Sequence, residues 1–233
     1  MKSSKLVFAL AFLCAIPYCR GQGTLILGHS GSVNPTNEGF SLLVSGSPSL
    51  TPVMNDQGYN AWSIGVSSGL DIAQYKQALT SQQVDTLSYG WILSLTLRVG
   101  EPVNPADSGI LAGFGGIALE FGAQANGDPA IELNNSEYIS NGGGPGYHNY
   151  QLRFDPTTDL ASVWLDGTEW LNDIQGSANP TSLIWGEIQR PSDASYYANW
   201  SEVSVLAAPE PSTGCLVLLG GGALIYARRK YLH

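Results

Sequence analysis

The segment between residues 22 and 208 contains no cysteine and very little positive charge. The three cysteines of the 233-residue chain, Cys14, Cys19 and Cys215, lie outside this segment, so disulfide bonds cannot stabilise it. It has four basic residues against eighteen acidic ones, which gives it a net charge of −14. Because such a surface repels nucleic acid and anionic lipid headgroups, we exclude nucleic-acid binding.

The N-terminus has the pattern of a secretory signal peptide. Two lysines precede an apolar stretch, Leu6 to Ile16, and a proline follows it. Small side chains then mark a cleavage site. We predict a signal peptide over residues 1–21 that signal peptidase cuts between Gly21 and Gln22, with a cut after Gly23 as the alternative. The remainder of the chain is then exported.

The C-terminus combines a short apolar run with a cluster of positive charge. Residues 214–227 carry no charge, and as a helix they would span about 21 Å, so the run is short for a permanent anchor in a hydrocarbon core of about 30 Å. Its flanks still suit a membrane. Arg228, Arg229 and Lys230 follow, and such clusters stay on the cytoplasmic side of a membrane. We therefore predict a single transmembrane-type helix over 214–227. The alternative is a buried helix of a soluble domain, which three consecutive glycines disfavour.

The order of elements over residues 208–233 resembles the PEP-CTERM protein-sorting signal. A Pro-Glu-Pro motif comes first, then the apolar run, then the basic tail of residues 228–230. The resemblance implies processing by exosortase, a membrane-embedded cysteine protease of Gram-negative bacteria that produce extracellular polysaccharide. It also implies retention in the inner membrane before processing and location at the cell surface or in the extracellular matrix afterwards. The residues that exosortase would recognise are Pro209, Glu210, Pro211, Ser212 and Thr213.

Short runs of alternating apolar and polar residues fill the segment between the two terminal signals. The clearest, residues 91–99, reads WILSLTLRV and places leucines on one face and polar residues on the other. Glycine, proline, asparagine and aspartate separate the runs, as is typical of a β-sandwich or barrel. Residues 80–88 instead have helical spacing, with Thr80 or Ser81 as the cap and Gly90 after the last turn.

Residues 147–171 predict a meander of three strands. A strand ends in an Asp-Pro-Thr-Thr turn, a second strand returns, and Asp166-Gly167 forms a tight hairpin into a third. This unit resembles the laminin-G or concanavalin A-like jelly roll. The resemblance implies one all-β domain over residues 22–207, built as an antiparallel β-sandwich without disulfides. We expect its core to contain Trp91, Leu93, Leu95, Leu97, Leu152, Phe154, Val163 and Leu165.

Two glutamates in this fold could carry out chemistry. Laminarinase-type glycoside hydrolases of the resembled fold carry Glu-x-Asp-x-x-Glu on one strand, and Glu132 and Glu137 match the two glutamates. The aspartate is replaced by Asn134, however, and the intervening residues read as a turn that would place the glutamates on different strands. We therefore predict a protein that is not an enzyme, and keep a surface glycoside hydrolase as the alternative.

Aromatic residues point to a different kind of site. All six tryptophans lie in the exported segment, and Tyr196, Tyr197 and Trp200 cluster near its end. Exposed aromatic rings stack on sugar rings, so these three residues are our candidate carbohydrate platform, with an extracellular polysaccharide as the partner. The sequence predicts no cofactor and no spacing typical of a metal site, although jelly rolls of this kind often hold calcium on a loop.

Overall fold

The computed structural model describes residues 23–67, 71–188 and 196–208, and residues 24–208 form one compact unit. The predicted signal peptide and the predicted sorting segment lie outside the described residues. Within the described ranges, no helix combines the length and the apolar character that crossing a membrane requires.

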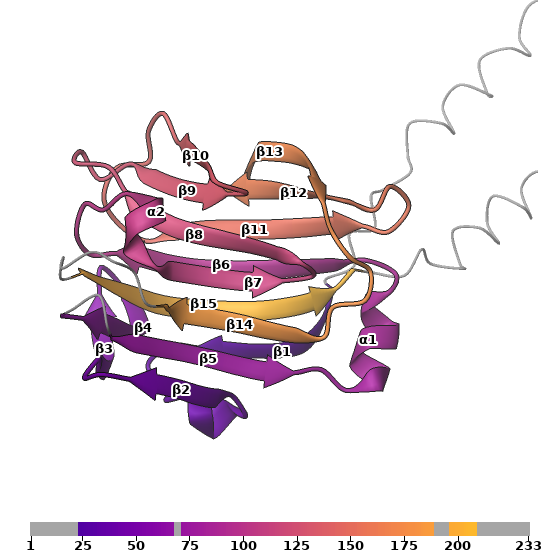
Figure 1. Ribbon diagram of the computed structural model, residues 1–233, viewed down its shortest axis with the longest axis horizontal. Helices are drawn as coiled ribbons and strands as arrows, with labels where there is room; N and C mark the ends of the chain where they lie inside the picture. Colours follow the sequence, from indigo (N-terminus) through magenta and orange to yellow (C-terminus); the bar gives the residue numbers. More distant parts are fainter. Residues whose placement is uncertain (1–22, 68–70, 189–195, 209–233) are drawn as a thin grey trace, which may run out of the picture. The chain divides into compact units, whose positions relative to one another are not determined.

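Two antiparallel sheets make up this unit, which confirms the all-β prediction (Figure 1). In order, the eight-stranded sheet contains β13 (Thr168–Gln175), β12 (Leu160–Leu165), β11 (His148–Asp155), β6 (Trp91–Val99), β15 (Tyr196–Ala207), β4 (Tyr59–Val66) and β3 (Ser49–Asp56), and β1 (Thr24–Ser30) also pairs with β15. In order, the seven-stranded sheet contains β10 (Ser136–Ile139), β9 (Pro129–Leu133), β8 (Ile117–Ala123), β7 (Ile110–Phe114), β14 (Ser182–Glu187), β5 (Ile72–Ala78) and β2 (Ser41–Ser45).

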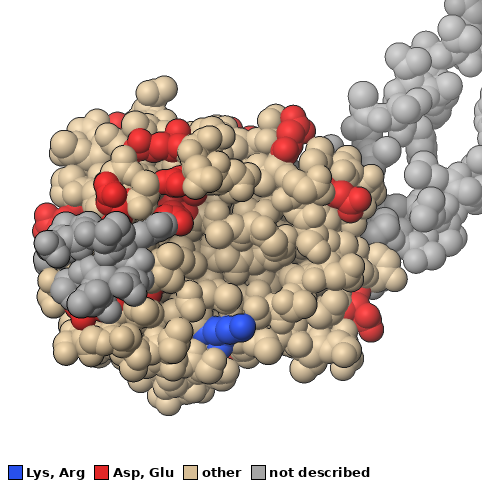
Figure 2. Space-filling view, viewed as in Figure 1, with Lys and Arg blue, Asp and Glu red and all other residues tan. Residues whose placement is uncertain are grey.

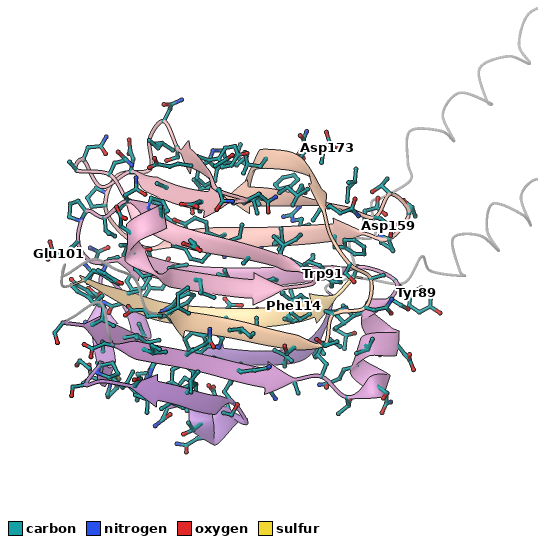
Figure 3. The ribbon with its side chains drawn as sticks, in the orientation of Figure 1. Tyr89, Trp91, Glu101, Phe114, Asp159 and Asp173 are labelled. Carbon is teal, nitrogen blue, oxygen red and sulfur yellow. The ribbon has the colours of Figure 1, made fainter. Side chains whose placement is uncertain are left out.

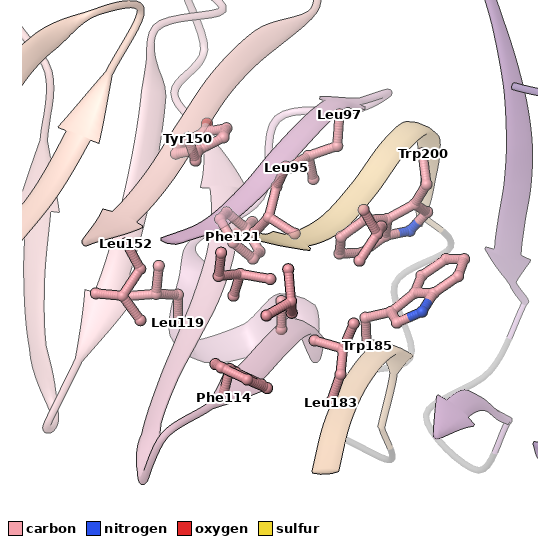
Figure 4. Close-up of a cluster of buried hydrophobic side chains, with 14 of the residues drawn as sticks. Leu95, Leu97, Phe114, Leu119, Phe121, Tyr150, Leu152, Leu183, Trp185 and Trp200 are labelled. Carbon is pink, nitrogen blue, oxygen red and sulfur yellow. The ribbon is translucent and has the colours of Figure 1, made fainter. Parts of the chain in front are cut away.

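Strand β6 alternates as predicted and shows how the sequence builds the core. Leu93, Leu95 and Leu97 are at most 1% exposed, while Ser94, Thr96 and Arg98 lie on the outer face. Strand β15 pairs with β6 on one side and with β4 and β1 on the other, so it lies near the middle of the sheet. Side chains from the two sheets meet between them in a single cluster (Figure 4).

Aromatic rings fill much of the space between the sheets. Trp91 of β6 packs edge-on against Phe114 of β7, with ring centroids 4.9 Å apart (Figure 3). Seven of the eight predicted core residues are buried, but Leu165 is only partly buried. The prediction was wrong for Leu165 because it closes β12 immediately before the Asp166-Gly167 turn, where the outer strand leaves the core. Both turn residues have positive φ, as the predicted tight hairpin requires.

The predicted helical turn is α1 (Ser81–Leu87). The side chain of Thr80 accepts a hydrogen bond from the backbone of Gln83, whose own side chain accepts one from the backbone of Thr80. This reciprocal cap confirms the predicted start and stabilises a helix too short to persist alone. Two further single turns are η1 (Pro35–Glu38) and α2 (Pro105–Ser108).

Candidate functional site

A groove of about 740 Å³ lies on the outer face of the eight-stranded sheet. It forms where β3, β4, β15 and β6 lie next to one another. Small residues create the hollow: Ser49 of β3 pairs with Gly65 of β4, and Gly65 pairs with Tyr197 of β15. Its volume is within the range of about 300–1,000 Å³ that is usual for small-molecule sites.

The carboxylate of Asp56 organises one side of this groove. Its Oδ2 accepts hydrogen bonds from Arg98 Nη2 at 2.7 Å, Asn199 Nδ2 at 2.8 Å and Tyr147 Oη at 2.9 Å. The three donors come from β6, from β15 and from the loop before β11. A single carboxylate therefore ties together three parts of the sheet that are distant in sequence.

These contacts also fix the charge of the carboxylate. Partial burial raises the pKa of Asp56, but the hydrogen bonds from Asn199 and Tyr147 and the positive charge of Arg98 outweigh this effect. The pKa therefore lies below its usual value, and Asp56 is ionised at neutral pH. The side chains of Asp56 and Arg98 are 18% and 20% exposed, so the ion pair is largely shielded from solvent.

Aromatic rings hold the guanidinium of Arg98 in place. Its Cζ lies 5.9 Å from the ring centroid of Tyr147 and 5.7 Å from that of Tyr197. The ring of Tyr59 stacks on that of Tyr147, with centroids 4.4 Å apart. Tyr197 lies close over Gly100, where a β-carbon would fall about 1.9 Å from the ring. Only glycine therefore allows Tyr197 to lie in this position.

Two buried polar atoms of the groove lack a hydrogen-bond partner. They are Nε of Arg98, a donor, and Oδ1 of Asn199, an acceptor. The orientation of the Asn199 amide follows from chemistry, since an ionised Asp56 accepts only from the nitrogen side of that amide. Arg98 and Asn199 are direct partners on β6 and β15, so the two atoms belong to neighbouring side chains on one face. Buried polar groups without partners are rare, and both of these residues line the groove.

The structure corrects part of the predicted aromatic platform. Tyr196 and Trp200 are 3% and 0% exposed, because even-numbered residues at the start of β15 point into the core. Trp200 packs against Trp185 of β14, with ring centroids 5.2 Å apart, so it cannot present a face to a sugar. Tyr197 points outward, lines the groove, and is the one member of the predicted trio that remains a candidate for stacking.

The glutamates of the alternative hydrolase site lie on two strands, as the turn predicted. Glu132 of β9 and Glu137 of β10 face each other across a hairpin whose turn residues, Asn134 and Asn135, have positive φ. Residues paired in this way have Cβ atoms about 4.5–5.5 Å apart, so the two glutamates are neighbours on one face of the sheet. Neither glutamate lines the groove, and Glu137 is exposed.

The two described histidines form no nucleophilic triad. His148 uses both ring nitrogens: Nδ1 lies 2.8 Å from Asp166 Oδ2 and Nε2 lies 2.9 Å from the carbonyl oxygen of Gly144. His29 contacts Glu38 through Nδ1 and stacks on Trp185 inside the core. Among the described residues, no group of three or more histidine, cysteine, aspartate or glutamate side chains could hold a metal ion.

No family model matches this chain, and no curated protein matches it. Solved structures match the fold. A carbohydrate esterase from the Shiga toxin-encoding bacteriophage phi24B aligns with 80% of this chain and 100% of its own, at 14% identity and a TM-score of 0.60.

Two structures of the botulinum neurotoxin DC binding domain also match. The one in complex with rat synaptotagmin II aligns with 85% of this chain at 13% identity and a TM-score of 0.53. The one in complex with SialylT also covers 85%, at 10% identity and a TM-score of 0.52. This chain spans about half the length of both. At these identities the likeness concerns the fold alone, a jelly-roll-like β-sandwich.

Sequence reasoning missed Asp56, Tyr147 and Asn199, and it placed Arg98 on the polar face of its strand without giving it a role. The signal that could have indicated Arg98 is its isolation: within residues 22–208 it is one of four positive charges, and it lies in a well-defined strand.

Proposed function

We propose that residues 24–208 form a non-enzymatic glycan-binding domain of an exported cell-envelope or extracellular-matrix protein. The groove on the eight-stranded sheet is the binding site, with Arg98 and Asn199 as the polar contacts and Tyr197 as the stacking ring. The observation that carries the proposal is the pair of unpartnered buried atoms, Arg98 Nε and Asn199 Oδ1, within this groove. The carbohydrate-related neighbours of the same fold support it.

The terminal segments give the domain its location in this proposal. The signal peptide of residues 1–21 directs export, and the helix at 214–227 holds the precursor in the inner membrane. Exosortase then recognises the Pro-Glu-Pro motif and releases or re-anchors the protein among extracellular polysaccharide. Binding of a surface glycan by the exported domain is consistent with that destination.

A direct test measures binding of the full chain to a panel of bacterial polysaccharides and oligosaccharides by isothermal titration calorimetry. We expect Arg98→Lys to weaken binding at least about tenfold, because lysine keeps the charge beside Asp56 but has no Nε donor. The matched control is Arg153→Lys, on the outer face of the same sheet but outside the groove. Equal binding by both variants would contradict the assignment of the site.

The sorting proposal has its own test. In cells with an active exosortase, Pro209→Ala and Pro211→Ala should leave uncut protein in the inner membrane, while the unaltered chain loses its tail. Mass spectrometry of the C-terminal peptide distinguishes the two states. An intact tail on the unaltered protein would contradict processing, and unchanged cleavage of both variants would remove these residues from the recognition motif.

A glycoside hydrolase is the second candidate, because Glu132 and Glu137 share one face of the sheet. Two carboxyl groups need a cleft with unequal environments to act as acid and nucleophile, whereas Glu137 is exposed, Glu132 is partly exposed, and neither lines the groove. Hydrolysis of a β-glucan by the unaltered protein, abolished by either Glu132→Gln or Glu137→Gln, would establish the hydrolase and overturn the non-enzymatic proposal.

A further inference from the structure

The hydrogen-bonding pattern of the groove specifies the kind of glycan it can accept. Arg98 and Asn199 are both held by the same carboxylate oxygen of Asp56, so neither side chain can turn away to find another partner. Among the buried atoms of the two side chains, this leaves one donor, Arg98 Nε, beside one acceptor, Asn199 Oδ1, on directly paired residues. A ligand that pairs both must accept one hydrogen bond and donate another at neighbouring positions.

A sugar hydroxyl meets that requirement, and a carboxylate or sulfate does not. A hydroxyl group donates one hydrogen bond and accepts others, whereas an ionised carboxylate only accepts. An anionic group placed here has no hydrogen to donate. Asn199 Oδ1 would therefore stay unpaired and would face another acceptor. It would also lie close to Asp56, whose negative charge already balances that of Arg98.

The charge of the rest of the domain also disfavours the binding of anionic glycans. Besides Asp56 and Arg98, the described lining of the groove is uncharged, consisting of serine, tyrosine, asparagine, glycine, valine and methionine. Outside the groove, the net charge of −14 over residues 22–208 repels polyanions at long range, an effect that salt screens over about 10 Å at 0.1 M. Long-range repulsion and the local hydrogen-bonding pattern therefore both disfavour acidic glycans.

Building on the function proposed above, we propose that the groove binds neutral, hydroxyl-rich glycans and discriminates against uronic-acid and sulfated ones. Arg98 Nε donates to a ring hydroxyl, Asn199 Oδ1 accepts from the same or a neighbouring hydroxyl, and Tyr197 covers the apolar face of the sugar. Asp56 is a positioning residue: it orients both contacts and cancels the charge that would otherwise attract an anion.

The test compares matched pairs of probes that differ in charge. Manno-oligosaccharides are compared with oligomannuronates, and galacto-oligosaccharides with oligogalacturonates, by calorimetry on the full chain at 0.05 and 0.5 M NaCl. We expect the neutral member of at least one pair to bind at least about tenfold more tightly at both salt concentrations, since a mispaired buried polar group costs about that much. If the preference for the neutral probe persists at high salt, it reflects local recognition, because salt screens long-range repulsion.

Two variants make the test specific. Asn199→Leu keeps about the same side-chain volume but removes both the Oδ1 acceptor and the Nδ2 donor to Asp56, so it should weaken the neutral probe at least about tenfold. Asp56→Asn leaves the charge of Arg98 uncompensated, so it should raise the affinity for the acidic member relative to the neutral one. Near-ultraviolet circular dichroism checks that each variant is folded, and Arg153→Lys should change neither ratio.

The outcomes separate this inference from the proposed function. Tighter binding of the acidic probes, lost in Arg98→Lys, would overturn neutral selectivity and leave glycan binding by the groove standing. No binding of any probe, or binding that neither Arg98→Lys nor Asn199→Leu changes, would overturn the proposed function itself.

Discussion

The outer faces of the two sheets share one core but differ in charge. On the eight-stranded sheet, Asp56 is balanced by Arg98 within a hollow lined with small polar side chains. On the seven-stranded sheet, Glu120, Glu132 and Glu137 are aligned across β8, β9 and β10. Figure 2, seen from the side of this second sheet, shows acidic side chains gathered over that region, and below it an area without acidic side chains that contains one patch of positive charge. A balanced charge and a hollow, more than the number of carboxylates, therefore distinguish the candidate binding face from the acidic face.

The largest expected effect comes from the core that supports both faces. Trp200→Ala removes a fully buried ring that contacts Trp185 and Phe121 of the opposite sheet. We expect the free energy of unfolding to fall by about 3–5 kcal/mol, measured by chemical denaturation. At temperatures where this variant is folded, glycan binding should persist. A loss below about 1 kcal/mol, with loss of binding, would restore Trp200 as a surface contact.

The second-largest effect is a difference in stability between matched variants on the two faces. Asp56→Ala leaves Arg98, Tyr147 and Asn199 without their common acceptor, and should lower the free energy of unfolding by about 2–3 kcal/mol. Glu132→Ala, the matched change on the other face, should change it by less than about 1 kcal/mol. Equal losses would show that the network adds no stability beyond that of a surface carboxylate.

The ionisation of Asp56 should also make the stability of the folded chain depend on pH. Because the pKa of Asp56 is lower in the folded chain than in the unfolded one, its contribution is complete above the unfolded value of about 3.8 and is lost as the pH falls through the folded pKa. Thermal unfolding between pH 2 and pH 5 should therefore show a loss of stability in the unaltered protein that is smaller in Asp56→Asn. Parallel curves for the two proteins would contradict the ion pair.

The third prediction concerns Glu187, a carboxylic acid buried in the interior between the two faces. Glu187 is 0% exposed, neither of its carboxyl oxygens has a hydrogen-bond partner, and burial, together with the nearby charge of Asp71, raises its pKa to about 9. Between about pH 4.5 and pH 9 the unfolded chain releases this proton and the folded chain keeps it, so stability falls as the pH rises.

Glu187→Gln should remove that slope. At pH 8 we expect its melting temperature to exceed that of the unaltered protein by at least about 2–4 °C, with little difference at pH 4.5. Scanning calorimetry at the two pH values measures both. A variant that melts lower at pH 8 would show that the ionised acid is stabilised in the folded chain.

The smallest effect concerns the acidic row. Glu137→Gln removes one of two like charges that face each other across the β9–β10 hairpin, so it should raise the free energy of unfolding by up to about 0.5 kcal/mol. Glycan binding should stay unchanged. A fall in affinity would move the binding site to the seven-stranded sheet.

The sequence predicted the features that depend on residues close together in the chain. Alternation placed the leucines of β6 inside and Arg98 outside, and the Thr80 cap and the Asp166-Gly167 hairpin lie where local residue preferences put them. The same alternation, applied to β15, would have placed Trp200 in the core. The interpretation of the aromatic cluster as a surface platform was therefore wrong for Trp200.

The binding network could not be predicted in the same way. The three donors to Asp56 are 42, 91 and 143 residues away along the chain, so only the strand order brings them together. That order follows from long-range pairing of β15 with both β4 and β6. No periodicity within one segment contains this information.

Hydrogen–deuterium exchange of the full chain, with and without a neutral oligosaccharide at saturating concentration, tests the central claim most directly. We expect slower exchange in peptides that cover residues 49–67, 96–100 and 196–200, and unchanged exchange over residues 117–139. Protection confined to residues 117–139 would place the site on the acidic face and contradict the assignment of the groove.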